Sequence, residues 1–536
     1  MMWLGGLGVA ALSLSASFLV VLAPEVMANG LAGLGLPLAL LGGLLLTLCL
    51  AAHPWGARAP TLTTAVGLRF DAPGLRRLVG VTSLLVCLLI LWGELASVLL
   101  LGSWWRWPSR WPLVAPGILG IAMVAWAGNR SLRWIRAGAF AITAVALCLP
   151  LVLIMVRTDP RPLPVWGEVA GQRTFAFKEE TVWSPLPDPW LPARPLTLEF
   201  RRSHRVTVRE PGRLRLVLTG GDRSQIVDRR VERDTTLPFL QGDRLILMDP
   251  VSLTFEGGKE IPGSPSSGAF WADGAWRRLR GELGLVVTLL VGALGMPPLL
   301  FALGSAPSPR VARRGLLLGA FLLALSLLAL QLWGIYGARF APQLYLGGVR
   351  WGEMVLLPEL VGMGHAGRGL VTLAQIGLLS AFVGAFTGAL EAGANAALAL
   401  GGARWPRLSV WAIGGVALAL AVASPLHPFR LAVSAFGLAA VTLAPSLFLT
   451  AWWGRVTPLG LGVGIVTGLV CFVAMLAMAH LPSGADPNWL DTLIRAPAVW
   501  LAPLVGLLIL LVSLYRPRGL TDHFSLLHRR LSRDGA

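Results

Sequence analysis

The sequence contains few charged residues, and this shortage decides the class of protein. Of its 536 residues only 13% are charged, whereas 55% are hydrophobic, and the mean hydropathy is +0.69. Soluble domains carry about 25% charged residues. The composition therefore excludes an ordinary soluble protein and indicates an integral membrane protein.

Acidic residues are the scarcer charges. The chain has 27 Asp and Glu against 45 Lys and Arg, almost all of them Arg, which gives a formal net charge of +18. No stacking platform or reading helix accompanies this excess, so we expect no nucleic acid among the partners. Cationic loops hold a membrane protein in place on its cytoplasmic side, and the lipid bilayer is the partner that they imply.

Cysteine and histidine are too few for metal or redox chemistry. The four cysteines lie inside apolar runs, as packing residues do, and the seven histidines are scattered. No CxxC or HExxH motif occurs. Because no nucleophile–base–orienter set is visible either, the sequence predicts no metal site, no cofactor and no enzyme.

Apolar runs long enough to cross a bilayer recur along the chain. A spanning helix needs about 20 apolar residues. The first run lacks a basic segment before it and continues into the second, so we expect no cleavable signal peptide. About twelve spans are predicted: 3–26, 33–52, 78–102, 112–128, 133–156, 282–304, 314–337, 369–400, 406–425, 429–453, 457–480 and 494–515.

Arginines gather in alternate short loops, and this sets the expected orientation. Cations favour the cytoplasmic side, and with a cytoplasmic N-terminus the cation-rich loops fall inside. An even number of spans returns both termini to the cytoplasm, and the tail 517–536 is basic as well. The cationic inside positions are Arg58, Arg69, Arg76, Arg77, Arg130, Arg133, Arg136, Arg310, Arg313, Arg314, Arg404, Arg407 and Arg455.

The long interruption at 157–281 is polar and differs from the other connections. Its alternating runs predict strands, and the Glu-Pro-Gly turn at 210–212 predicts a hairpin between two of them. The loop count places this small β-rich domain outside the cytoplasm, where a protein partner is conceivable. The predicted strands are 196–200, 205–208, 213–218, 244–248 and 251–255.

The apolar run 286–303 contains an unusual interruption. Gly292, Gly295, Pro297 and Pro298 fall at its centre, and proline removes a backbone donor and clashes with the preceding turn. Two interpretations stay open. The break exposes backbone groups for a binding site, or it is a kink that aids packing.

Motifs near the C-terminal end resemble the sodium:solute symporter family. In 435–468 a small-residue helix runs into Pro445, then aromatics, a short loop and a helix with spaced glycines. The family pattern is P-x-L-x-L followed by W-(K/R)-x-x-T-x-x-G, and the segment from Trp453 to Gly460 keeps most of it.

Other segments follow in register, nearest to the acetate-permease branch of the family. The run 12–22 is similar to that branch's first core helix, and 61–102 to its cytoplasmic loop and next helix. The turn at 125–142, which keeps Gly128, and the segment 292–303 also resemble family motifs. The resemblance covers nearly the whole chain except 157–281, which looks inserted.

The resemblance implies an all-α polytopic protein of the LeuT type, built from two inverted five-helix repeats, in a bacterial inner membrane. The first repeat would occupy 1–156 and the inserted β-rich domain 157–281. The second repeat and two extra helices would occupy 282–516, and a basic cytoplasmic tail 517–536.

The resemblance also implies a sodium site. It would take backbone carbonyls near Ala10 and Ser13, and a Ser–Thr hydroxyl pair from the eighth core helix. Thr387 matches the threonine, whereas Phe386 stands where the serine is expected. A further departure is that no acidic residue precedes Glu25 in the first helix, although the acetate branch has an Asp there.

The substrate would bind between the first and sixth core helices, where Ser15, Ser17, Gly295 and Met296 are the candidates. Partial positive charge at a broken helix end would favour a carboxylate there.

Two carboxylates within predicted spans, Glu94 and Glu391, also need an account. Such residues usually face a cavity or a partner. Each is either a protonatable coupling site or a hydrogen-bonded structural group.

Two functions follow. The first is cation-coupled symport, with Na⁺ or H⁺, of a small organic solute such as acetate by alternating access. The second is a symporter-like protein without transport, whose β domain serves sensing, ligand binding or complex assembly.

Overall fold

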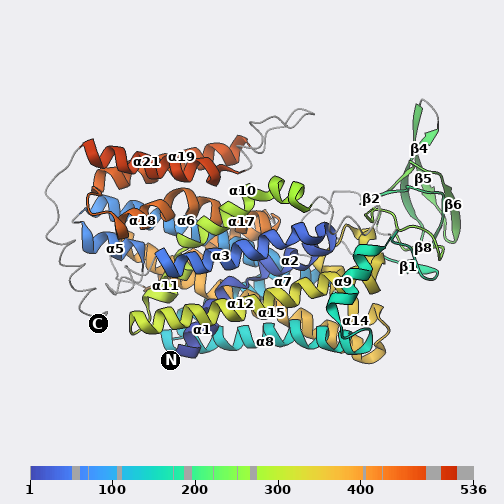
Figure 1. Ribbon diagram of the computed structural model, residues 1–536, viewed down its shortest axis with the longest axis horizontal. Coiled ribbons are helices and arrows are strands. Elements are labelled where there is room, and N and C mark those ends of the chain that lie inside the picture. The colour runs from blue at the N-terminus through green and yellow to red at the C-terminus, as the bar shows by residue number, and fades with distance from the viewer. Residues whose placement is uncertain are drawn as a thin grey trace.

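The computed structural model describes most of the chain as one elongated helical bundle with a β domain at one end (Figure 1). The predicted tail 517–536 lies outside the described residues. These residues are 2–50, 61–70, 72–104, 111–172, 174–185, 196–220, 223–249, 251–265, 275–401, 406–424, 426–478 and 496–515.

The helices agree closely with the predicted spans. Eight of the described helices are long and apolar enough to cross a membrane, and a bent pair of helices makes a ninth candidate. Three shorter apolar helices, Ala32–Leu48, Leu113–Trp126 and Arg407–Ala423, occupy the remaining predicted positions.

The first half of the bundle holds five spans. Before the third of them comes a short helix with a capping box at Thr61, which accepts from the Thr64 N–H and so fixes where the helix begins. The elements are α1 (Met2–Ser13), α2 (Ala16–Asn29), η1 (Gly30–Leu34), α3 (Gly35–Leu50), α5 (Leu62–Arg69), α6 (Pro73–Trp104), α7 (Trp111–Trp126) and α8 (Asn129–Arg157).

The second half repeats this plan and adds two helices. Short helices again precede its third span. The elements are α10 (Ala275–Leu294), α11 (Pro297–Gly304), α12 (Pro309–Phe340), η3 (Pro342–Gly347), α13 (Trp351–Met354), α14 (Leu357–Leu360), α15 (Gly364–Gly401), α16 (Pro406–Ala423), α17 (Pro428–Leu438), η4 (Ala439–Leu443), α18 (Ala444–Trp452), α19 (Pro458–Met478) and α21 (Pro497–Tyr515).

Packing between the halves is reciprocal. The first span of one half lies on the second span of the other, so α1 packs on α12 and α10 packs on α3. The long helices α6 and α15, third in each half, pack on each other at the centre. This exchange is the contact pattern that two inverted five-helix repeats produce.

Both halves begin with a broken helix. The break between α10 and α11 falls at Gly295 and Met296, inside the segment where glycine and proline predict it. The helix predicted at 3–26 is also broken, between Ser13 and Ala16, with a bend of 65°. The break between α1 and α2 has no glycine or proline beside it that could have predicted it.

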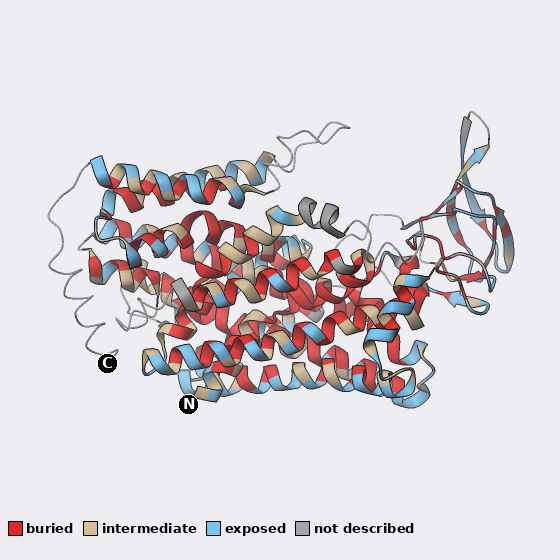
Figure 2. Cartoon of the chain, in the orientation of Figure 1, coloured by how far each residue is buried: buried red, intermediate tan, exposed pale blue. Residues whose placement is uncertain are grey.

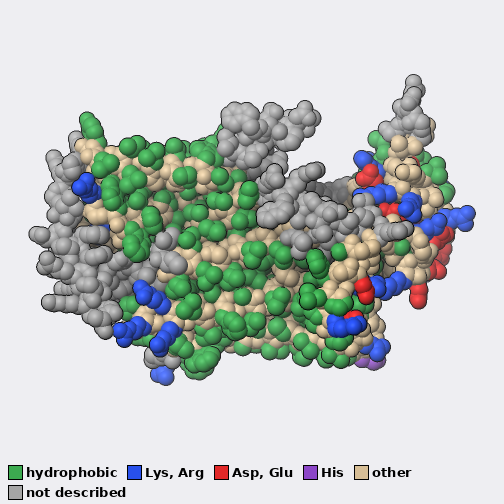
Figure 3. All heavy atoms as spheres, viewed as in Figure 1, with side chains coloured by type: hydrophobic (Ala, Val, Ile, Leu, Met, Phe, Trp, Pro, Cys, Tyr) green, Lys and Arg blue, Asp and Glu red, His purple; other side chains and the backbone are tan. Residues whose placement is uncertain are grey.

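Apolar side chains cover the outside of the bundle as well as its interior. Figure 2 shows buried residues on the facing sides of the helices, while leucine, valine and isoleucine side chains such as Leu119, Val156 and Leu511 lie exposed. Figure 3 shows the resulting apolar band, with charged residues gathered at its two ends. A surface of this kind suits the hydrocarbon core of a bilayer.

The β domain follows helix α9 (Pro162–Gly171) and is an eight-stranded jelly roll. Its two antiparallel sheets have the orders β1-β8-β3-β6 and β2-β7-β4-β5. The strands are β1 (Thr181–Trp183), β2 (Leu196–Glu199), β3 (His204–Val208), β4 (Gly212–Gly220), β5 (Arg223–Val231), β6 (Thr235–Phe239), β7 (Arg244–Leu247) and β8 (Leu253–Phe255).

The predicted hairpin at 210–212 is wrong. The turn joins β3 to β4, but β3 pairs with β6 and β8, whereas β4 pairs with β5 and β7. The turn therefore carries the chain from one sheet to the other. Helix α10 begins at Ala275, and the part of it that is apolar enough to cross a membrane begins at Glu282, as predicted.

Aromatic contacts join the jelly roll to the bundle. Phe175, which leads into the domain, packs against Tyr345 of η3 with ring centroids 5.2 Å apart. The Tyr345 hydroxyl donates to the Met27 carbonyl of α2 at 2.9 Å. The jelly roll thus contacts an element that is also bonded to α2, the second half of the first broken helix.

Candidate functional site

A cavity of about 60 Å³ lies at the centre of the bundle, where the two broken helices face each other. Ser13, Ser15 and Ser17 line it from the first break, and Met296 lines it from the second. Glu94 of α6 completes its polar wall. The structure therefore brings together three of the four predicted substrate residues, Ser15, Ser17 and Met296, with one of the two carboxylates.

Glu94 binds the start of α2. Its carboxylate accepts from the Ala16 N–H at 3.1 Å and from the Ser17 N–H at 3.4 Å, and the side chain is buried. Ser15 is the N-cap residue of α2 but makes no side-chain cap bond. Glu94 thus caps α2 from another segment. A negative charge at the N-terminus of a helix interacts favourably with the helix dipole, which stabilises the helix by about 0.3–2 kcal/mol.

The second break, between α10 and α11, is stabilised by close packing. A Cβ atom on Gly295 would lie 2.7 Å from the Ala444 nitrogen and 2.8 Å from the Ala439 oxygen, both at the ends of the π-helical segment η4. Gly295 is itself not among the residues that line the cavity. Its role in the structure is to let α10 approach the span that α17, η4 and α18 form.

The implied sodium site lies where α1 meets α15. Gly388 allows this contact, because a Cβ there would lie 2.0 Å from the Leu12 side chain. The Thr387 hydroxyl donates to the Val383 carbonyl at 2.8 Å. The Ser13 hydroxyl donates to the Val9 carbonyl at 3.0 Å, and the Ala10 carbonyl accepts from the Leu14 N–H.

Phe386 turns away from this contact. Its ring stacks on Phe382 at 4.9 Å and lies against Gly120 of α7, where a Cβ would come within 2.7 Å of it. Its side chain therefore fills the space between α15 and α7, and only its backbone carbonyl has an oxygen to offer. The serine hydroxyl that the resemblance implies has no replacement at this position.

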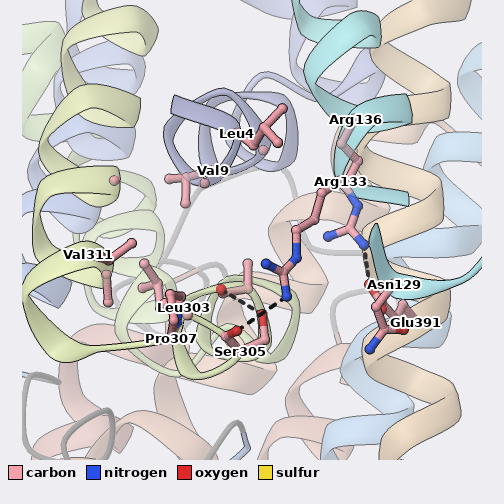
Figure 4. A pocket seen from close by; sticks show the side chains of 16 residues that line it. Leu4, Val9, Asn129, Arg133, Arg136, Leu303, Ser305, Pro307, Val311 and Glu391 are labelled. Atoms are coloured by element: carbon pink, nitrogen blue, oxygen red, sulfur yellow. Dashed lines mark hydrogen bonds and ion pairs between the residues drawn. The ribbon is translucent and has the colours of Figure 1, made fainter. Parts of the chain in front are cut away.

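Glu391 lies in a different environment, in an ion pair with Arg136 of α8. Both side chains are more than 90% buried. They line a second cavity, of about 50 Å³, between the starts of α1, α8 and α12 and the end of α11. Figure 4 shows Arg133 reaching across this cavity to the Ser305 carbonyl, at 3.4 Å.

Sequence reasoning missed three of the residues at these sites. Arg136 appears only as a loop cation, although it is the partner of Glu391. Phe18 and Phe436, which line the central cavity, carry no motif that distinguishes them from lipid-facing aromatics. Phe18 follows the first break by two residues, whereas Phe436 lies on α17, far in sequence from both breaks, and has no signal there.

Comparison with known proteins identifies the fold. No protein-family profile matches the chain, and no curated protein matches it either. Among solved structures, a substrate-bound, outward-open Na⁺-coupled sialic acid symporter has a TM-score of 0.59 and 14% identity, over 97% of this chain and 90% of that one. Mhp1, a nucleobase-cation-symport-1 family transporter in a closed conformation with bromovinylhydantoin bound, has a TM-score of 0.46 and 12% identity, over 99% and 96%.

The first of these similarities establishes a polytopic membrane protein with the LeuT-type fold of sodium-coupled symporters. It confirms the predicted fold class, and the strands of the described residues confirm the inserted β region. The acetate-permease branch is not singled out by it.

Proposed function

We propose that the protein is a secondary active transporter that couples the movement of a small solute to that of a cation. The observation that carries this proposal is the enclosed central cavity between two broken helices. Transporters with inverted repeats bind substrate and coupling ion at such breaks, midway through the membrane.

Alternating access would proceed through the second cavity. In this structure α8 is tied to α15 by the Arg136–Glu391 ion pair and to the end of α11 by the bond from Arg133 to Ser305. These contacts lie around the second cavity, near the N-terminal end of α1. Opening a route to it from the central cavity would require that α1 and α11 move away from α8.

Sodium is the proposed coupling ion. Na⁺ is a hard cation that takes oxygen ligands, as Ca²⁺ and Mg²⁺ do. Ala10 and Ser13 offer carbonyl oxygens at the end of α1, and Thr387 offers a hydroxyl on the facing side of α15. Since Phe386 supplies no hydroxyl, we expect a weaker sodium site than a Ser–Thr pair would give. Proton coupling at Glu94 is the alternative.

The expectation that acetate is the solute remains a prediction from the resemblance. Among the described residues that line the central cavity, none is basic. A carboxylate would therefore depend on backbone donors for its binding.

We further propose that both termini are cytoplasmic and that the jelly roll lies outside a bacterial inner membrane. Arg130, Arg310, Arg313 and Arg314 are exposed near the starts of α8 and α12, at the end of the bundle that lies opposite the jelly roll. Basic residues of this kind favour the cytoplasmic side.

A symporter-like protein that no longer transports is the second candidate. Two observations favour it, the missing hydroxyl at Phe386 and the jelly roll that rests on η3 through Phe175 and Tyr345. In that case the jelly roll would bind a ligand or a protein partner, and the bundle would serve as its membrane anchor.

Equilibrium binding of labelled sodium to the purified protein tests the first proposal. We expect saturable binding that Thr387→Ala weakens by about tenfold or more, because the cation loses one oxygen ligand. Thr372→Ala is the matched control, since Thr372 lies exposed on the same helix and its hydroxyl also bonds to a carbonyl four residues earlier. Absence of sodium binding to the unaltered protein would contradict sodium coupling and favour Glu94 or the second candidate.

A further inference from the structure

The only charged side chain among the described residues that line the central cavity is the carboxylate of Glu94. The other polar groups that line it are hydroxyls, from Ser13, Ser15 and Ser17. A ligand in this cavity therefore meets one carboxylate, three hydroxyls that can donate or accept, and no basic side chain among the described residues. This balance of charge favours a cation over an anion.

Helix N-termini could still bind an anion through backbone N–H groups. At the first break this role is already filled, because the Ala16 and Ser17 N–H groups of α2 donate to Glu94. A solute carboxylate would have to displace Glu94 and would then leave a buried charge without its donors.

The second break, between α10 and α11, has few backbone donors for a chemical reason. Helix α11 begins with Pro297 and Pro298, which carry no N–H group. The next N–H groups belong to Leu299 and Leu300, and that of Leu300 donates to the Met296 carbonyl at 3.1 Å. The first turn of α11 thus offers an anion little more than the Leu299 N–H group.

Two aromatic rings also line the cavity. Phe18 of α2 and Phe436 of α17 both line it, with ring centroids 5.6 Å apart and planes at 87°. The face of an aromatic ring attracts a cation, and ammonium groups are recognised in this way. The carboxylate and the two rings therefore favour the same charge on the ligand.

The size of the cavity limits the ligand. One water needs about 10–15 Å³ of such volume, so 60 Å³ admits roughly four to six non-hydrogen atoms. Apolar side chains such as Leu12, Leu40 and Ile90 form the rest of the lining and suit short aliphatic groups.

From these observations we propose that the solute is a small organic cation, an ammonium ion with short alkyl groups, and that Glu94 binds its positive charge. This inference rests on the proposed transport function and names its substrate class. A carboxylate has about four lone-pair sites, so Glu94 can cap α2 and still accept from an ammonium group. The alkyl part of the solute then lies against Phe18 and Phe436.

The test compares two probes with the same number of non-hydrogen atoms, n-propylammonium and acetate, for binding to the purified full-length protein in sodium. We expect n-propylammonium to bind saturably and acetate not to bind. Glu94→Gln should weaken n-propylammonium binding by about tenfold or more, because a bond to a charged group is lost. Phe436→Leu should weaken it by about threefold, since the ring face is lost.

Glu25→Gln is the matched control, because Glu25 also lies on α2 but does not line the cavity. It should bind the probe as the unaltered protein does. Sodium binding, measured on the same samples, reports whether each variant has kept its fold.

Three outcomes would overturn the inference. Binding of acetate without n-propylammonium would make the solute an anion, and equal binding of n-propylammonium to Glu94→Gln would remove Glu94 from the site. Sodium binding with neither probe bound would overturn it as well and leave sodium coupling intact. Absence of sodium binding to the unaltered protein would instead contradict the sodium coupling of the proposed function.

Discussion

At the scale of single residues, the two buried carboxylates show what sequence can and cannot predict. Their position inside apolar spans predicts that Glu94 and Glu391 need partners. The partners themselves could not be predicted. Arg136 lies 255 residues before Glu391, and Glu94 binds backbone N–H groups, which have no signature in a sequence.

The Arg136–Glu391 pair permits a prediction about stability. Removing one member of a buried ion pair leaves the other charge without compensation, at a cost of about 3–5 kcal/mol. We therefore expect Glu391→Leu and Arg136→Met each to lower the melting temperature of the detergent-purified protein strongly. The double variant should recover most of the loss, because apolar residues of similar volume replace the pair.

Thermal unfolding followed by tryptophan fluorescence measures all three variants. Losses that add up in the double variant would show that the two side chains do not depend on each other, contrary to their contact in the structure.

At the scale of elements, the two helix breaks have different origins. The break before α11 follows from the local sequence, because Gly295 and Pro297 are poor helix formers. The interruption was predicted there. The break between α1 and α2 was missed because Leu14 and Ser15 are ordinary residues in a helix. This break is stabilised from a distance, by Glu94 of α6, so only the folded bundle reveals it.

Gly295→Ala tests whether the second break depends on close packing. The added methyl would meet backbone atoms of Ala439 and Ala444, which cannot rotate away as a side chain can. Overpacking of this kind costs about 1–3 kcal/mol, and we expect the upper part of this range. The same substitution at Gly138 of α8 is the control, because nothing lies within 4 Å of its Cβ position. A melting temperature for Gly295→Ala that matches the control would contradict the packing account.

At the scale of the whole molecule, the order of the apolar helices followed from apolar length alone, although three of the twelve predicted spans are shorter helices. The pairing of the strands in the jelly roll did not follow from their alternation. Alternation identifies a strand but not the strand with which it pairs. The turn at 210–212 was taken for a hairpin because β3 and β4 adjoin it, yet the two strands belong to different sheets. Strand β5 was missed because its residues from Gln225 to Arg230 are all exposed and show no alternation.

The orientation of the molecule yields the last prediction. Helix α8 has 29 residues and is about 43 Å long, which exceeds the thickness of a bilayer core. Its start and the jelly roll that follows its end therefore lie on opposite faces of the membrane. Ser131→Cys, at the start of α8, and Ser203→Cys, in the jelly roll, introduce exposed thiols at these two ends. With the arginine-rich end in the cytoplasm, a membrane-impermeant maleimide added to intact cells should label Ser203→Cys and not Ser131→Cys. Permeabilised cells should show labelling of both, and the unaltered protein gives the background. Labelling of Ser131→Cys alone in intact cells would invert the topology and place the jelly roll in the cytoplasm.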